Sequence, residues 1–484
     1  MAESSSTGIP SPLPMRIEHD LLGTLQVPAD VYYGIQTLRA VQNFQLSGVP
    51  LSHYPKLVTA LAMVKLAAAE ANHGLGHLKT TKYRAICDAC RQIIQGQHHD
   101  QFVVDMIQGG AGTSTNMNAN EVIANLGLVS MGLQQGEYQH LHPNNDVNMA
   151  QSTNDAYPTA IRLGLLLEHD SLMSSLEMLC QALAGKGREF ADIVKMGRTQ
   201  LQDAVPMTLG QEFHAFATTL NEDLGHLSRQ VPALLSEVNL GGTAIGTGIN
   251  ADPRYQHLAV EHLARISDHP LVPAYDLIEA TSDMGDFVLF SGMLKRLAVK
   301  LSKICNDLRL LSSGPRTGLN EINLPPRQPG SSIMPGKVNP VIPEAVNQVA
   351  FEVIGNDLAL TMAAEGGQLQ LNVMEPLIAY KIFDSIRLLT KAMDMLRTHC
   401  VLGITANRER CSELVENSIG LITALNPYIG YENATRIARV ALESGKGVLD
   451  LVREEHLLEE GQLTEILRPD KMVAPVQFLT SGNE

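Results

Sequence analysis

The strongest constraint on the fold is a long apolar stripe near the middle of the chain. From residue 287 to residue 311 the apolar positions are spaced alternately by three and four residues. This spacing is a heptad seam sustained for more than three heptads. It predicts a helix about 37 Å long, which needs partner helices lying nearly parallel to it. The stripe consists of Phe287, Phe290, Leu294, Leu297, Leu301, Ile304, Leu308 and Leu311.

Two further stripes indicate that this helix has partners. One runs from residue 209 to residue 231 and is expected to stop at Pro232, and another runs from 378 to 396 after Pro376. Weaker periodicity covers 161–183 and 346–362. Because strand-like alternation is scarce, we predict a mainly all-α chain in which β-sheet is minor. The seams favour an elongated central bundle of long helices, shared between subunits.

Composition excludes several classes of protein. The 484 residues carry a formal net charge of −15, which disfavours binding to nucleic acid or to an anionic membrane. No run of about 18 apolar residues exists to form a transmembrane helix. The six cysteines are dispersed, which suits a reducing compartment, and we expect a cytoplasmic protein. Cys87 and Cys90 form a lone CxxC pair, which we interpret as two cysteines of one helix.

Polar loops rich in Gly, Ser, Thr and Asn lie between the predicted helices. Any one such loop is most often only a turn. Together they offer hydroxyls, amides and backbone N–H groups, which suit the binding of carboxylates and of charge that builds up on a carboxylate. The loops are GGAGTSTNMN (109–118), QSTND (151–155), GRTQLQDA (197–204), GGTAIGTG (241–248) and GSSIMPGKVNP (330–340).

The last of these loops has the highest density of functional groups. It combines Ser331 and Ser332 with the cation of Lys337 and the amide of Asn339, within a backbone rich in Gly and Pro. It is no P-loop, because Val338 stands where a Ser or Thr would bind magnesium. No nucleophile elbow of the G-x-S-x-G type occurs in the chain.

GSSIMPGKVNP resembles the hallmark segment of the fumarase/aspartase superfamily of lyases. The resemblance extends from Arg16 to about Gly430. It implies a mainly α-helical, three-domain subunit and a homotetramer built around a core of twenty long helices. We expect a flexible tail at 1–14, which is rich in Ser and Pro, an N-terminal domain at 15–151, a central bundle domain at 152–406 and a small helical domain at 407–484.

The resemblance also implies roles for individual residues. Ser331 would be the catalytic base, used as an alkoxide that backbone N–H groups and Lys337 stabilise. Each active site would combine loops from three subunits. Separately from the resemblance, the net charge of −15 would repel a dianionic substrate at long range, so we expect arginines such as Arg16 or Arg39 to add positive charge at the site. The implied substrate-binding residues are Thr113, Ser152, Thr153, Asn154, Thr199, Gln200, Ser332, Lys337 and Asn339, with Glu344 in support.

At the positions where this sequence differs from fumarases, it resembles the aspartase branch of the superfamily. Gln200 stands where fumarases carry a histidine, and an amide cannot shuttle a proton. Glu344 lies in VIPE rather than TQCE, and GQLQLNVMEP (367–376) replaces the fumarase segment. The implied reaction is the reversible deamination of L-aspartate to fumarate and ammonia. A fumarate hydratase and a non-catalytic structural protein of the same fold remain as alternatives.

The resemblance implies small-molecule partners only, namely the dicarboxylates L-aspartate and fumarate. It implies no cofactor, and leaves room for a divalent cation such as Mg²⁺ as an activator. No cluster of residues in the sequence has the spacing of a metal site.

Overall fold

The computed structural model describes residues 14–473, except for the side chains of residues 469 and 470. The predicted N-terminal tail, apart from Pro14, and the last eleven residues of the predicted C-terminal domain, 474–484, lie outside this range. The chain divides into two compact units. Unit 1 contains the residues up to Leu172, Leu227–Lys295 and Val353–Arg387, and unit 2 contains Met173–His226, Arg296–Glu352 and the residues from Leu388 onward.

The N-terminal part of unit 1 is a two-stranded hairpin followed by packed helices. The hairpin is antiparallel and pairs Met15 with Pro28. Helix α2 is apolar on almost every side, as expected for a helix surrounded by others, and it packs against α3 and α7. The elements are β1 (Met15–Asp20), β2 (Gly23–Pro28), α1 (Ile35–Asn43), η1 (Leu51–His53), α2 (Pro55–Gly74), α3 (Thr80–Ile94), η2 (His99–Gln101), α4 (Thr113–Ser130) and the π-helical turn η3 (Pro143–Val147).

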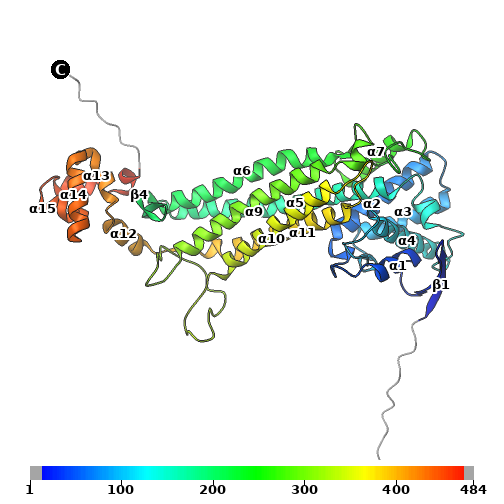
Figure 1. Cartoon of the computed structure of the whole chain (residues 1–484), viewed down its shortest axis with the longest axis horizontal. Coiled ribbons are helices and arrows are strands. Elements are labelled where there is room, and N and C mark those ends of the chain that lie inside the picture. Colours follow the sequence, from blue (N-terminus) through cyan, green and yellow to red (C-terminus); the bar gives the residue numbers. More distant parts are fainter. Residues whose placement is uncertain (1–13, 474–484) are drawn as a thin grey trace, which may run out of the picture. The chain divides into compact units, whose positions relative to one another are not determined.

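Five long helices contribute segments to both units and are the long ribbons of Figure 1. They are α5 (Thr153–Glu189), α6 (Leu209–Ser236), α9 (Gly285–Leu311), α10 (Val341–Glu365) and α11 (Glu375–His399). The stripe predicted over 287–311 is confirmed as the buried seam of α9, because none of its eight residues is more than 4% exposed. The weaker periodic stretches lie within α5 and α10.

Polar contacts show how the long helices pack within each unit. In unit 1, Arg162 of α5 pairs with Asp286 of α9, with Nη1 and Oδ2 2.9 Å apart. In unit 2, Lys300 of α9 pairs with Asp223 of α6 at 2.8 Å. Such pairs flank the apolar seams and keep buried charge neutralised.

One predicted helix boundary is wrong. Helix α6 does not stop at Pro232 but continues for one more turn to Ser236. Leu235 in that turn is fully buried, and Arg162 donates a hydrogen bond to the carbonyl oxygen of Leu234 at 2.7 Å. These tertiary contacts offset the backbone hydrogen bond that a proline removes. At α11, Pro376 lies in the first turn, where a missing N–H costs little.

Short elements complete unit 1 between α6 and α9. The strands β5 (Glu237–Val238) and β6 (Val272–Pro273) pair in parallel. Around them lie α7 (Tyr255–Ser267) and α8 (Glu279–Ser282). The segment between β5 and α7 contains the glycine-rich loop 241–248.

Unit 2 adds two small sheets and a cluster of short helices. Buried apolar residues such as Leu425, Ile437 and Val452 form the core of that cluster. All strand pairing of the described residues is confined to two-stranded sheets, which confirms the expectation that sheet is minor. The elements are β3 (Val194–Thr199), β4 (Gln202–Thr208), β7 (Ile322–Asn323), η4 (Val401–Gly403), β8 (Thr405–Ala406), α12 (Arg408–Glu416), α13 (Leu421–Ile429), α14 (Tyr431–Ser444), α15 (Val448–Glu454), α16 (Glu460–Ile466) and α17 (Pro469–Met472).

The CxxC pair lies inside helix α3, as expected for two cysteines of one helix. Cys87 and Cys90 are both buried, and neither forms a disulfide. Burial raises the pKa of the Cys87 thiol to about 11, which keeps it protonated at neutral pH. Within residues 14–473, no helix combines the length and the apolar character that crossing a membrane requires.

Candidate active site

The predicted site residues fall into two groups, one in each unit. They lie in loops, in the first turns of helices and, for Thr199, at the end of strand β3. Unit 1 holds Thr113, Ser152, Thr153 and Asn154, whereas unit 2 holds Thr199, Gln200, Ser331, Ser332, Lys337, Asn339 and Glu344.

The loop 330–340 in unit 2 is closed at its base by backbone and side-chain contacts. Gly330 donates its N–H to the carbonyl oxygen of Lys337 at 2.7 Å. The side chain of Asn339 donates to the carbonyl oxygen of Gly330 at 2.9 Å. A Cβ at Gly330 would lie 2.7 Å from that Lys337 oxygen, so this position requires glycine. Asn339 therefore supports the loop as well as offering an amide to it.

Within this loop, Ser331 occupies an electrostatically favourable position for a negative charge. Its Oγ accepts hydrogen bonds from the backbone N–H groups of Ile333 at 3.2 Å and Met334 at 3.1 Å. Two donors directed at one oxygen favour its ionised form. Lys337 is exposed, and no carboxylate of the described residues pairs with it. The loop thus presents one serine oxygen held by N–H donors and one unpaired cation.

Thr199 and Gln200 lie at the tip of the β3–β4 hairpin. Thr199 pairs with Gln202, leaving a two-residue turn of Gln200 and Leu201. Both turn residues have positive φ, 56° and 60°, a conformation that such turns demand and that costs side-chain-bearing residues energy. The exposed tip carries the polar groups predicted for substrate binding.

A buried ion-pair network anchors the same hairpin. Lys195 of β3 lies 2.6 Å from Glu212 and 2.8 Å from Glu321. Arg198 also pairs with Glu321, at 2.7 Å. Lys195 and Glu321 are at most 2% exposed, so two cations balance carboxylates away from water. The network holds the base of the hairpin while its tip remains exposed.

Thr113 in unit 1 is the first residue of helix α4. Its hydroxyl donates to the carbonyl oxygen of Gly110 at 2.8 Å. Gly112 precedes it with φ +86°, and a Cβ there would lie 2.2 Å from the ring of Tyr157. The buried Tyr157 ring therefore defines how closely the backbone before Thr113 packs on α5.

Ser152, Thr153 and Asn154 form the start of helix α5. The Ser152 hydroxyl oxygen accepts from the N–H of Asn154 at 3.3 Å. The amide group of Asn154 donates to the carbonyl oxygen of Ala244 at 2.8 Å. Thr153 accepts from the side chain of Asn116 at 3.1 Å. Each side chain is therefore held by a local contact.

A buried polar network beneath this group was not predicted from the sequence. Lys65 Nζ donates to the side-chain oxygens of Asn116 at 2.6 Å, Asn148 at 3.0 Å and Gln151 at 2.8 Å. Burial lowers the pKa of Lys65 to about 7, and the charge of Asp155 partly opposes that shift. The signal in the sequence that could have revealed this network is the single lysine within the apolar stretch ALAMVKLAAA.

Asp155 is a second buried ionisable residue that was not predicted from the sequence. It is fully buried and its carboxylate accepts the N–H groups of Ser152 at 2.8 Å, Gly241 at 2.9 Å and Thr243 at 3.0 Å. Burial raises its pKa to about 6, against the effect of those hydrogen bonds. Asp155 thus ties the start of α5 to the loop 241–248.

The two arginines expected to add positive charge are both occupied elsewhere. Arg16 pairs with Glu18 at 2.7 Å and donates to backbone carbonyls of Pro28 and Val31. Arg39 pairs with Asp20 at 2.8 Å. Each charge is balanced by a carboxylate, so these arginines stabilise the N-terminal hairpin.

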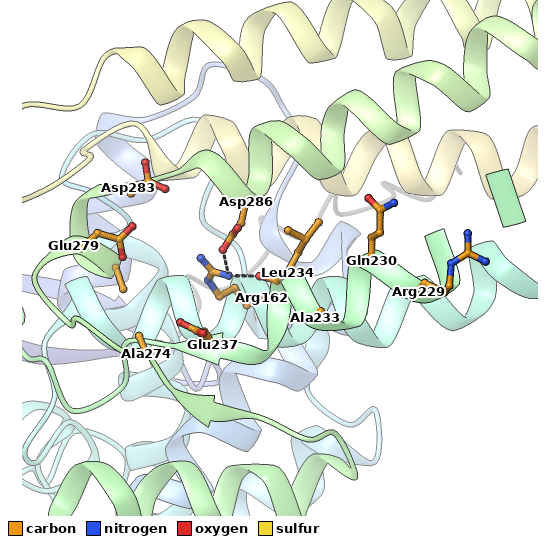
Figure 2. Close-up of a pocket in the computed structure, with 11 residues that line it drawn as sticks. Arg162, Arg229, Gln230, Ala233, Leu234, Glu237, Ala274, Glu279, Asp283 and Asp286 are labelled. Carbon is orange, nitrogen blue, oxygen red and sulfur yellow. Dashed lines mark hydrogen bonds and ion pairs between the residues drawn. The ribbon is translucent and has the colours of Figure 1, made fainter. Parts of the chain in front are cut away.

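A cleft of about 510 Å³ lies elsewhere in unit 1 (Figure 2). Arg162 lies within it and pairs with Asp286. None of the predicted site residues lines this cleft. Its charged lining residues are Arg162, Arg229, Glu237, Glu279, Asp283 and Asp286. Carboxylates outnumber arginines there, which does not suit a dianionic substrate.

Comparison with known protein families decides the family. Residues 23–355 match the family described as "Lyase", and residues 421–474 match "Fumarase C C-terminus". The chain belongs to the fumarase/aspartase family of lyases. The family assignment made from GSSIMPGKVNP is thereby confirmed, as is the mainly helical lyase fold.

Individual members of the family are very similar to the chain. An aspartate ammonia-lyase of Pseudomonas aeruginosa is 80% identical over 460 residues, covering 95% of this chain and 97% of its own length. Among solved structures, a fumarate lyase:delta crystallin from Brucella melitensis bound to cobalt superposes with TM-score 0.93 at 59% identity, covering 96% and 100%. A class II fumarase from Schistosoma mansoni gives TM-score 0.89 at 36% identity, covering 95% and 99%. The chain is thus far closer to this ammonia-lyase than to this fumarase.

The described residues contain no group of three or more His, Cys, Asp or Glu side chains placed to hold a metal ion. Apart from the supporting Glu344, the expected site residues carry hydroxyls, amides and one lysine ammonium group, whose chemistry suits organic carboxylates.

Proposed function

We propose that the protein is an aspartate ammonia-lyase, which converts L-aspartate to fumarate and ammonia and catalyses the reverse addition. The observation that carries the proposal is the 80% identity to the Pseudomonas aeruginosa enzyme of that name, over 95% of the chain. The loop geometry supports it, because Ser331 Oγ accepts two backbone N–H groups. A serine held in this way has the electrostatic support that an alkoxide base needs.

In the proposed reaction, Ser331 removes the proton from the carbon that bears the β-carboxylate of L-aspartate. The C–H electron pair moves onto that carboxylate, giving a dianionic aci-carboxylate. Thr113, Ser152, Thr153 and Ser332 bind this group with hydroxyl and N–H donors, which stabilise charge that exists only along the reaction path. The electron pair then returns to form the double bond of fumarate, and the C–N bond breaks with its electron pair leaving on nitrogen, so that the substrate ammonium group departs as ammonia.

The other end of the substrate, which carries the α-carboxylate and the amine, is assigned to residues of both groups. Lys337 and Asn339 bind the α-carboxylate together with Thr199, and Asn154 and Thr113 contact the leaving amine. Gln200 lies at the hairpin tip and contributes binding rather than proton transfer. Glu344, in the first turn of α10, is assigned a supporting role.

The site as proposed requires a homotetramer in which three subunits contribute to each active site. An exposed apolar face on helix α10 supports this assembly. Phe351, Ile354, Leu358 and Met362 recur at helical spacing and are 37–65% exposed. A stripe of this kind on a long helix is typical of a surface that packs against another helix.

The electrostatics of substrate binding are local. A net charge of −15 repels a dianion at long range, so the unpaired cation of Lys337 and the N–H donors of the loops must attract it. The proposed chemistry needs no redox or electrophilic cofactor. We also propose that a divalent cation such as Mg²⁺ activates the enzyme and that the protein is cytoplasmic.

The test is the formation of fumarate, followed by its ultraviolet absorbance, from L-aspartate and separately from L-malate. We expect fumarate from L-aspartate only, and its loss in Ser331→Ala. Fumarate from L-malate only would make the protein a hydratase. An intact oligomer that is silent with both substrates would favour a non-catalytic role.

A further inference from the structure

The glycine-rich loop 241–248 has no part in the proposed reaction, yet its backbone is tightly constrained. Gly246 and Gly248 both donate their N–H groups to the carbonyl oxygen of Gly242 at 3.0 Å. Gly241, Gly246 and Gly248 have φ of +97°, +94° and +67°. A Cβ at Gly246 would lie 2.4 Å from backbone atoms of Leu277 and Ile278. The loop is therefore packed into one conformation against the segment that precedes α8.

Several hydrogen bonds join this loop and the adjacent Asn239 to the start of helix α5. The carboxylate of Asp155 accepts the N–H groups of Gly241 and Thr243. The side chain of Asn239 donates to the carbonyl oxygen of Asn154 at 2.9 Å. The side chain of Asn154 in turn donates to the carbonyl oxygen of Ala244 at 2.8 Å. All of these residues belong to unit 1.

The last contact determines the orientation of the Asn154 amide. A backbone carbonyl only accepts hydrogen bonds, so the NH₂ group of Asn154 must face Ala244. The side-chain oxygen Oδ1 then faces the other way. No donor among residues 14–473 is bonded to it. The position therefore offers a free acceptor rather than a free donor.

We infer that the loop 241–248 is a positioning element that orients Asn154 so that its Oδ1 accepts a hydrogen bond from the substrate ammonium group. An ammonium group carries only donors, so an amide turned the other way would repel it. This inference rests on the proposed function, in which Asn154 contacts the leaving amine. It adds that the specificity of this contact is set by Ala244 and Asp155 through backbone geometry.

The test separates binding of the amine from binding of the carboxylates. In the reverse reaction, ammonium and fumarate are separate substrates, so each has its own KM. Gly246→Ala forces the loop away from Leu277, whereas Gly248→Ala is a matched control. Gly248 also has positive φ, but its added Cβ would meet only the Gly241 oxygen at 3.4 Å. Both are measured on the assembled protein.

We expect Gly246→Ala to raise the KM for ammonium about tenfold or more, the size expected for losing a hydrogen bond to a charged group. The KM for fumarate and the inhibition constant of succinate, which lacks the amine, should stay within about twofold, because the carboxylate contacts are untouched. Gly248→Ala should resemble the wild type in all three. Asn154→Ala should give the largest ammonium effect.

Parallel rises in all three constants would mean general damage to the site and would overturn the inference. Equal behaviour of Gly246→Ala and Gly248→Ala would overturn it as well. If Gly246→Ala does not fold, Asn239→Ala removes the contact to the Asn154 carbonyl from outside the loop and should show the same selective ammonium effect. A wild-type protein with no activity on aspartate would overturn the proposed function, and this inference with it.

Discussion

The hydroxyl oxygen of Ser331 lies 3.1 Å from the backbone nitrogen of Met334 and accepts its hydrogen bond. The N–H of Ile333 donates to the same oxygen at 3.2 Å. These donors belong to the loop itself, so their arrangement does not depend on a distant element. The same short segment therefore supplies the proposed base and part of the field that would stabilise its charged form.

Replacing Ser331 by alanine should slow the reaction strongly without disturbing the fold. General-base catalysis contributes about 10²–10⁴-fold, so kcat should fall by about a thousandfold. Fumarate formation from L-aspartate measures this. Ser444→Ala is a suitable control, because Ser444 is exposed and bonds only within its own region of α14. A Ser331→Ala enzyme that retains normal kcat would exclude Ser331 as the base.

Lys337→Gln should weaken substrate binding by removing the unpaired cation of the loop. Loss of a hydrogen bond to a charged group costs about 1.5–3 kcal/mol, so kcat/KM for L-aspartate should fall by about ten- to a hundredfold. Steady-state kinetics at several salt concentrations tests this. Lys303→Gln, which removes an exposed lysine already paired with Asp307, should change kcat/KM little.

Gly112→Ala should damage the Thr113 region, because the added methyl would collide with the ring of Tyr157. Overpacking of this kind costs about 1–3 kcal/mol, in addition to the strain of a positive φ. Gly110→Ala has the same kind of φ, +89°, but its Cβ would approach only Thr113, at 3.9 Å. Thermal denaturation and kinetics of the two variants should show the larger loss in Gly112→Ala. Equal losses would mean that backbone strain, not the collision, matters.

Leu358→Asp should dissociate the proposed tetramer and abolish activity together. Leu358 is 65% exposed on the apolar face of α10, and a buried, unpaired charge at an interface is costly. Light scattering coupled to size-exclusion chromatography reports the mass. Leu442→Asp is the control, because Leu442 is 71% exposed on α14. A Leu358→Asp protein that remains a full tetramer would remove this face from the interface.

The buried Asp155 should make stability depend on pH. Burial raises its pKa from 3.8 to about 6, so between these values the folded chain binds a proton that the unfolded chain has released. The contribution of Asp155 to the free energy of unfolding is therefore greatest below pH 4. It decreases by about 3 kcal/mol as the pH rises through 6. Denaturant titrations at pH 4.5, 5.5 and 6.5 should show this slope in the wild type. This pH dependence should be absent in Asp155→Asn. Identical slopes of the free energy of unfolding against pH in the two proteins would contradict its assignment to Asp155.

Much of the helical architecture could be predicted because it is a local property of the sequence. The stripe from Phe287 to Leu311 became the buried seam of α9, since helical periodicity aligns such residues on one face. The end of α6 could not be predicted in the same way. Pro232 normally ends a helix, but packing of Leu235 and the contact from Arg162 extend it. Those contacts depend on residues far away in the sequence.

The sequence by itself determined which loops carry functional groups and to which family the chain belongs, because glycines, hydroxyls and the lysine of GSSIMPGKVNP are visible as letters. Only the tertiary structure decided how those groups are held. The N–H groups that donate to Ser331 and the carbonyl of Ala244 belong to the backbone, which nearly every residue type supplies. The identity of a residue in the sequence therefore does not reveal them. Likewise, the burial of Lys65 and Asp155 arises from long-range packing. Hydrogen-bond direction and desolvation are properties of a folded arrangement, and they give these residues their distinctive chemistry.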